Sequence, residues 1–112
     1  MKTFKEVNLE AGRPYVADAI SHMRSEINKS KKNGGGCILF IHGYGSSGVG
    51  GGIGVECRNV LDKMKSTNTI KNYIKGEDFT LFNFDALALK NRYKELTKLL
   101  DVCNHGVTVV EI

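Results

Sequence analysis

The residues best suited to chemistry stand where an apolar run meets a glycine-rich stretch. The run Cys37–Ile41 is typical of a buried strand, and it ends at His42. An imidazole titrates near neutral pH, so His42 could act as a general acid or base, or donate to a phosphate oxygen. Backbone N–H groups in a glycine loop between a strand and a helix often gather around an anion. We therefore expect a phosphate site here, with His42 at its rim.

The glycine-rich stretch supplies the candidate contacts to such an anion. Its amides and hydroxyls could donate to phosphate oxygens, and its tyrosine could stack on a base. The candidates are Gly43, Tyr44, Gly45, Ser46, Ser47 and Gly48. The same glycines would also serve a tight turn, and His42 could simply hold that turn in shape. Both interpretations stay open.

Three further residues are candidates on weaker grounds. Glu10 ends the first predicted strand and should lie near His42 if the first two strands are neighbours. There it could orient the imidazole or hold a divalent cation, although a solvated glutamate is the simpler interpretation. Lys31 and Lys32 lie in the basic turn that follows the first predicted helix. They could contact a phosphate backbone or only suit the negative end of the helix dipole. No CxxC pair occurs, so we expect no zinc site.

Periodicity predicts the elements that must position these residues. Alternation of strands and helices indicates an α/β fold in the order β-α-β-α-β-(β)-α-β, an α+β sandwich with helices packed on a mixed sheet of four to five strands. The second helix should carry Arg58 on its outer side, and Asp85 should cap the third helix. Strands are expected at 5–9, 37–41, 69–75, 79–84 and 107–112, and helices at 16–30, 55–64 and 85–100.

Composition sets the broad class. The chain has 112 residues, of which 41% are hydrophobic and 25% charged, so one domain over 1–112 is expected. A net charge of +4 favours a polyanionic partner. No window approaches the roughly 20 apolar residues needed to cross a bilayer, and no secretory signal follows Met1. The bland interpretation of Cys37 and Cys57 is buried reduced thiols. We therefore expect a cytoplasmic protein without a membrane partner.

Several stretches together resemble the Smr (small MutS-related) domain. Segment 41–48, IHGYGSSG, is similar to the family's His-Gly-x-Gly-x-Gly motif, and segment 106–112, GVTVVEI, is similar to its last strand. Residues 7–10 stand where the family's first motif belongs, but with Asn8 and Glu10 in place of the usual Asp and His or Arg. The arginine that commonly follows the glycine loop is missing, since Arg58 lies further along. Segment 76–103 resembles an insertion that carries an extra helix.

The resemblance implies a β-α-β-α-β-β domain that binds DNA or RNA and, in many members, nicks it. It would make His42 a catalytic residue of an endonuclease, with the glycine loop contacting the nucleic acid. The retained His-Gly-x-Gly motif favours this enzyme. The altered first motif favours a nucleic-acid or protein interaction module without cleavage. Other sites are excluded by missing residues, since the chain lacks the Gly-Lys-Ser/Thr ending of a Walker loop and the Gly-x-Ser-x-Gly of an α/β-hydrolase.

Overall fold

The fold is built on a mixed four-stranded sheet of order β1-β2-β4-β3. The computed structural model describes residues 2–43 and 52–112. Strands β1 and β2 pair in parallel, while β4 runs antiparallel to both of its neighbours, β2 and β3. The strands are β1 Thr3–Asn8, β2 Gly36–Ile41, β3 Asn72–Lys75 and β4 Val107–Glu111. The α/β class and the mixed sheet predicted from the sequence are therefore confirmed.

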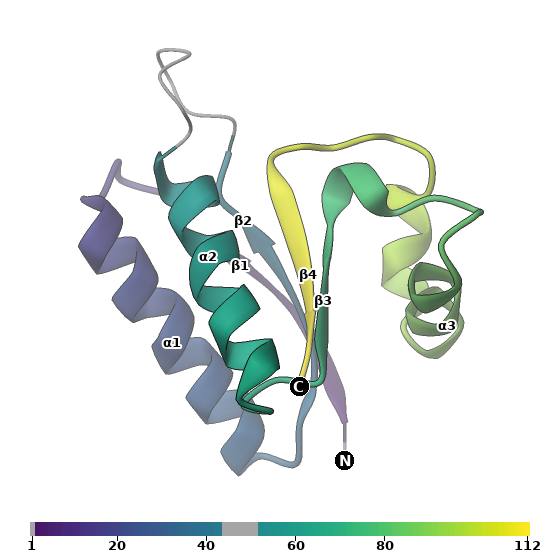
Figure 1. Cartoon of the computed structure of the whole chain (residues 1–112), viewed down its shortest axis with the longest axis horizontal. Helices are drawn as coiled ribbons and strands as arrows, with labels where there is room; N and C mark the ends of the chain where they lie inside the picture. Colours follow the sequence, from purple (N-terminus) through teal and green to yellow (C-terminus); the bar gives the residue numbers. More distant parts are fainter. Residues whose placement is uncertain (1, 44–51) are drawn as a thin grey trace.

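Two helices, α1 (Val16–Lys32) and α2 (Gly52–Ser66), cover one face of this sheet. They lie side by side, and Figure 1 shows both on the same side of the strands. Their apolar stripes pack on alternate residues of the central strands, which is what the period of a strand requires. The core on this face includes Ala19, Met23, Ile27, Cys57, Leu61, Ile38, Phe40 and Val110.

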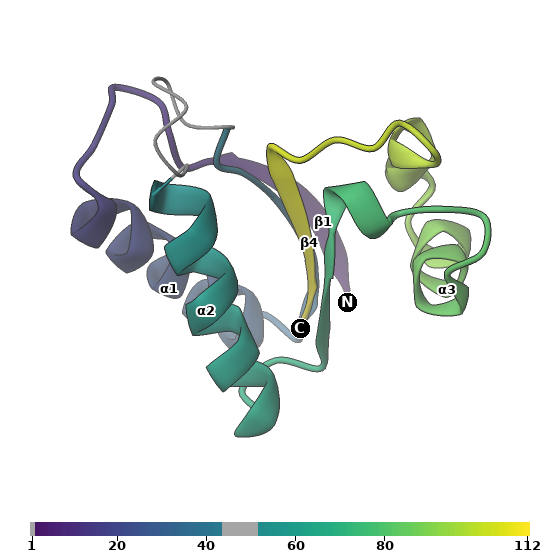
Figure 2. The same ribbon diagram turned by 45° about the horizontal axis from the view of Figure 1, so that its top comes forward.

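The other face is covered by segment 76–103, the segment that resembles an insertion in the sequence. It holds a short 3-10 helix η1 (Gly76–Asp78), helix α3 (Phe84–Arg92) and a second 3-10 helix η2 (Lys94–Leu99). Figure 2, turned by 45°, again shows α3 on the side of the sheet away from α1 and α2. A second core forms here from Phe79, Ala86, Leu89, Tyr93, Leu96, Leu99, Cys37, Leu39, Val107 and Val109.

Two predictions within this segment are wrong. Residues 79–84 do not form an edge strand. Phe79 is fully buried, whereas Phe82 is 94% exposed at a turn, so the apolar residues there do not share one face of a sheet. The cap of α3 is Asn83 rather than Asp85, because the Asn83 side chain accepts a hydrogen bond from the N–H of Ala86 at 3.1 Å.

The third helix is also shorter than its apolar stripe predicted. It ends at Arg92, where Tyr93 adopts an extended backbone, and a 3-10 helix continues the chain. Tyr93 and Leu96 are nevertheless buried as the stripe required. The apolar spacing therefore predicted which residues are buried, but it did not predict that the chain changes from an α-helix to a 3-10 helix.

Replacing Phe79 should show that the second core stabilises the whole fold. We expect Phe79→Ala to lower the free energy of unfolding by about 3–5 kcal/mol, because a fully buried phenyl group leaves a cavity. Phe82→Ala is the matched control and should change it by less than about 0.5 kcal/mol, since that ring is in solvent. Equilibrium urea unfolding measures both. Equal stabilities for the two variants would show that the second core does not stabilise the fold.

Candidate functional site

The parallel pairing of β1 and β2 brings two of the predicted residues together. Asn8 is level with Ile41, and the N–H of Leu9 donates to the Ile41 carbonyl at 2.7 Å, so Glu10 and His42 leave the sheet at the same edge. The Glu10 carboxylate lies over Gly43, where an added Cβ would overlap it. Gly43 also has φ +72°, which favours glycine. The predicted contacts Tyr44, Gly45, Ser46, Ser47 and Gly48 lie outside the described residues.

His42 does not lie at the rim of this edge as expected. It continues the alternation of Ile38 and Phe40, so its side chain points to the face that α2 covers, and only 3% of the residue is exposed. The first turn of α2 packs directly on the imidazole. A Cβ on Gly54 would lie 2.7 Å from His42 Nδ1, so glycine at this position allows the close approach.

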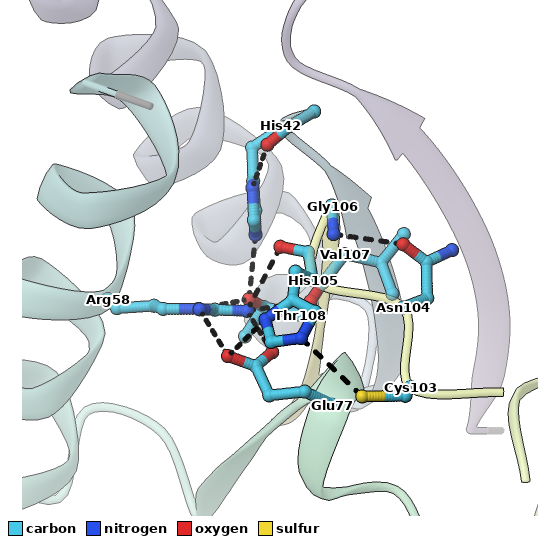
Figure 3. Close-up of polar contacts among 10 residues, drawn as sticks. His42, Arg58, Glu77, Cys103, Asn104, His105, Gly106, Val107 and Thr108 are labelled. Atoms are coloured by element: carbon cyan, nitrogen blue, oxygen red, sulfur yellow. Dashed lines mark hydrogen bonds and ion pairs between the residues drawn. The ribbon is translucent and has the colours of Figure 1, made fainter. Parts of the chain in front are cut away.

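Both ring nitrogens of His42 are engaged inside the protein, as Figure 3 shows. Nδ1 lies 3.1 Å from the Gly43 carbonyl oxygen, which can only accept, so we assign the proton to Nδ1. Nε2 then accepts from the Thr108 hydroxyl at 2.9 Å. The Thr108 oxygen in turn accepts from Arg58 Nε at 3.1 Å. The three side chains form one directed chain of hydrogen bonds that holds the imidazole neutral.

The electrostatics of the site agree with a neutral imidazole. Burial lowers the pKa of His42, and the nearby charge of Arg58 lowers it further. The hydrogen bond to the Gly43 carbonyl and the charges of Glu77 and Glu10 act in the opposite direction without reversing the shift. A buried, uncharged histidine with both nitrogens bonded is suited to fixing the turn after β2. In this arrangement neither nitrogen is free to exchange a proton with a substrate.

Arg58 links this chain of hydrogen bonds to the second face of the sheet. It was expected on the outer side of its helix, but its side chain is 19% exposed and points inward. NH1 and NH2 donate to the two Glu77 carboxylate oxygens at 2.9 and 2.7 Å, and NH2 also reaches the Val107 carbonyl at 3.1 Å. Such a two-pronged pair is among the stronger polar contacts in proteins.

The Glu77 carboxylate is held in its charged form by these contacts. Burial raises its pKa, but hydrogen bonds from its own backbone N–H and from Arg58 outweigh burial, and the pKa of Glu77 is lowered. Sequence reasoning missed Thr108 and Glu77 altogether. Thr108 sits in a run of β-branched residues typical of any strand, and Glu77 sits in a turn, so neither position carried a signal.

The structure separates Lys31 and Lys32 from His42. Helix α1 runs back against the parallel strands, so its last turn lies at the edge where β2 begins, about 20 Å from where β2 ends. The last turn of α2 lies at the same edge, and Lys71 precedes β3 there. We call this group the lysine edge; its members are Lys2, Lys29, Lys31, Lys32, Lys63, Lys65 and Lys71.

The lysine edge carries exposed positive charge and a pocket. Within the described residues, none of its lysines has a carboxylate oxygen within 4.0 Å. A pocket of about 340 Å³ lies there, and its lining is both polar and apolar: Lys31, Gly34, Gly35, Asn68, Thr69, Ile70, Lys71 and Ile112. Lys31 Nζ donates to the Thr69 carbonyl at 2.9 Å, which fixes one ammonium group at its wall.

Comparisons with known proteins do not assign the chain to a family. No family model matches the chain, and neither the curated proteins nor the solved structures contain a significant match. In the described part of the chain, no group of three or more His, Cys, Asp or Glu side chains is arranged to hold a metal ion. Over the same residues, no helix is both long and apolar enough to cross a membrane.

The lowered pKa of His42 predicts how stability depends on pH. The unfolded chain binds a proton at this histidine near pH 6.5, whereas the folded chain resists it, so the free energy of unfolding should fall as pH drops below about 6.5. His42→Asn, which does not titrate but keeps an N–H donor, should remove this part of the pH dependence. Urea unfolding between pH 5 and 8 measures it.

His22→Asn is the matched control for this measurement. His22 lies on the exposed side of α1 beside Glu26, away from the buried chain of hydrogen bonds. It should keep the wild-type fall in stability between pH 7 and 5. If His42→Asn follows the same pH curve as the wild type, the buried neutral imidazole is not the cause.

Proposed function

We propose that the chain is a cytosolic nucleic-acid-binding domain that holds a phosphate backbone with its lysine edge. The observation that carries this proposal is the meeting at one edge of lysines from the last turns of α1 and α2 with the lysines that precede β1 and β3, and no carboxylate pairs with them within the described residues. Phosphate contacts by lysine supply most of the sequence-independent affinity for DNA or RNA. The overall charge of +4 acts in the same direction.

The helix dipole alone is an insufficient reason for this clustering. It favours basic residues in the last turns of α1 and α2, where Lys29, Lys31 and Lys32 and their counterparts on α2 stand. It does not account for Lys2 and Lys71, which flank strands. The neighbouring ammonium group of Lys71 lowers the pKa of Lys2. Two ammonium groups side by side repel each other, and a bound phosphate would relieve that repulsion.

The resemblance to the Smr domain supports the proposal in part. The strands and helices follow the order β-α-β-α-β-β of that family once segment 76–103 is set aside. We propose that His42 stabilises the turn that precedes the glycine-rich stretch and does not cleave phosphodiesters, because both of its nitrogens are bonded within the fold. The chain then acts as a binding module rather than as a nuclease.

Removing two lysines should weaken binding and its salt dependence together. For Lys31→Ala/Lys32→Ala we expect weaker binding to single-stranded DNA and RNA oligonucleotides. The slope of log affinity against log salt should fall by roughly 1.4, since each phosphate contact to a single strand contributes about 0.7. Fluorescence anisotropy at several salt concentrations measures both quantities and also shows whether DNA or RNA is preferred.

Arg13→Ala/Arg24→Ala is the charge-matched control. Both residues are exposed and lie away from the lysine edge, Arg13 before α1 and Arg24 in its middle. This variant should keep most of the affinity and a nearly wild-type salt slope. The opposite result, loss of binding in the arginine variant alone, would place the nucleic acid at Arg13 and Arg24 and away from the lysine edge. If the wild type binds neither nucleic acid at moderate salt, the proposal is wrong.

A nicking assay separates the binding module from the endonuclease. We expect no cleavage of supercoiled plasmid or structured RNA above background, with or without Mg²⁺, because His42 is buried and bonded. His42→Ala should therefore leave the assay unchanged while lowering stability. Cleavage by the wild type that disappears in His42→Ala would show that His42 is catalytic and would contradict the proposed role.

A further inference from the structure

A cysteine, a histidine and a glutamate lie in line on the side of the molecule where segment 76–103 meets β4. Cys103 is exposed, and its Sγ lies 3.4 Å from His105 Nε2. His105 Nδ1 lies 3.4 Å from Glu77 Oε2 on the opposite side of the ring. Figure 3 shows the imidazole between the sulfur and the carboxylate. A nucleophile beside a base, with a third group orienting the base, is the general arrangement of an activated nucleophile.

We propose that Cys103 is a reactive thiol, with His105 as its base and Glu77 as a positioning residue, and that it takes up low-molecular-weight disulfides by thiol–disulfide exchange. This reactivity is independent of nucleic-acid binding at the lysine edge. The carboxylate of Glu77 favours the His105 tautomer with its proton on Nδ1, which leaves Nε2 as the acceptor facing the thiol. The distances allow the proton of the thiol to pass to Nε2.

The exchange balances without any further reactant. His105 Nε2 takes the thiol proton, and the Cys103 thiolate attacks one sulfur of the incoming disulfide. A new S–S bond to Cys103 forms as the S–S bond of the reagent breaks. The leaving thiolate takes the proton back from Nε2, so His105 returns to its neutral form. Cys103 is oxidised to a mixed disulfide, and half of the reagent is reduced to a free thiol.

His105 and Glu77, the base and the carboxylate that orients it, lie far apart in the sequence. Cys103 and His105 are two residues apart, so their proximity alone could follow from the turn. Glu77 belongs to η1, and Arg58 on α2 holds both of its oxygens at 2.9 and 2.7 Å. Glu77 and Arg58 are the charged groups that face His105 from these elements, and His105 also offers its carbonyl to Arg58 NH2 at 3.5 Å.

The other two cysteines of the chain are internal controls. Both are buried, and burial raises the pKa of Cys37 to about 12 and that of Cys57 to about 11. Thiolate is the reactive form, so neither should react while the protein is folded. Cys103 has φ +59°, a left-handed backbone, and its thiol lies on the surface beside His105.

The test measures the rate of reaction of the folded full chain with 5,5′-dithiobis(2-nitrobenzoate) at pH 7. We expect one fast-reacting thiol, which Cys103→Ser removes. His105→Ala should slow the fast reaction at least about tenfold, as loss of a general base does. Since His105 is exposed, this variant should remain folded. His22→Ala, the matched exposed histidine, should react at the wild-type rate.

The role of Glu77 has its own readout. In Glu77→Gln the rate should fall more at pH 6.5 than at about pH 9.5, where an ordinary thiol ionises without a base. A purely structural effect would lower both rates equally. With glutathione disulfide, mass spectrometry should find the mixed disulfide on Cys103 in the wild type and less of it in His105→Ala. An unchanged rate in His105→Ala, or a fast phase that survives in Cys103→Ser, would overturn the proposal.

Discussion

The ion pair between Arg58 and Glu77, together with the hydrogen bond from Arg58 to Thr108, connects the two sides of the molecule. The arrangement of the surrounding elements depends on it. Removing one partner from such a pair leaves an uncompensated charge, at a cost of about 3–5 kcal/mol in well-buried cases. Here the pair is about four-fifths buried and bonded on nearly every side. Helix α2, strand β4 and η1 must therefore keep their relative positions for the charge to stay satisfied.

This ion pair lies between two histidines in different surroundings: His42 is buried, and His105 is exposed. His42 accepts a hydrogen bond from the Thr108 hydroxyl, whose oxygen accepts one from Arg58, and the imidazole stays neutral and buried. His105 meets the other end of the same pair, where Glu77 offers it a carboxylate oxygen at the surface. One salt bridge thus meets a buried imidazole through Thr108 and an exposed imidazole directly. The general-base role that the sequence predicts for His42 is one that we propose instead for His105, toward a thiol.

Much of the fold followed from patterns that burial enforces on a single element. The strand at 37–41 is apolar throughout because both of its faces are covered, and the stripe of α1 has the spacing of one buried helical face. The strand predicted at 79–84 was wrong because its apolar residues do not share one environment. Phe79 is buried, whereas Phe82 and Phe84 are exposed. Alternation predicts a strand only where a partner strand exists to receive it.

The candidate site was harder to predict because its contacts join elements distant in sequence. Glu10 and His42 were correctly expected at one edge, since parallel strands end together. The same rule sends the ends of the helices to the other edge, so Lys31 and Lys32 could not join them. Arg58 looked like an outward helix residue because its partner Glu77 lies 19 positions away, in a segment that resembled an insertion. That segment supplies both the second core and the carboxylate that neutralises Arg58. Deleting it would therefore expose one face of the sheet and leave a largely buried cation unpaired. It is therefore part of the same cooperative structure as the sheet.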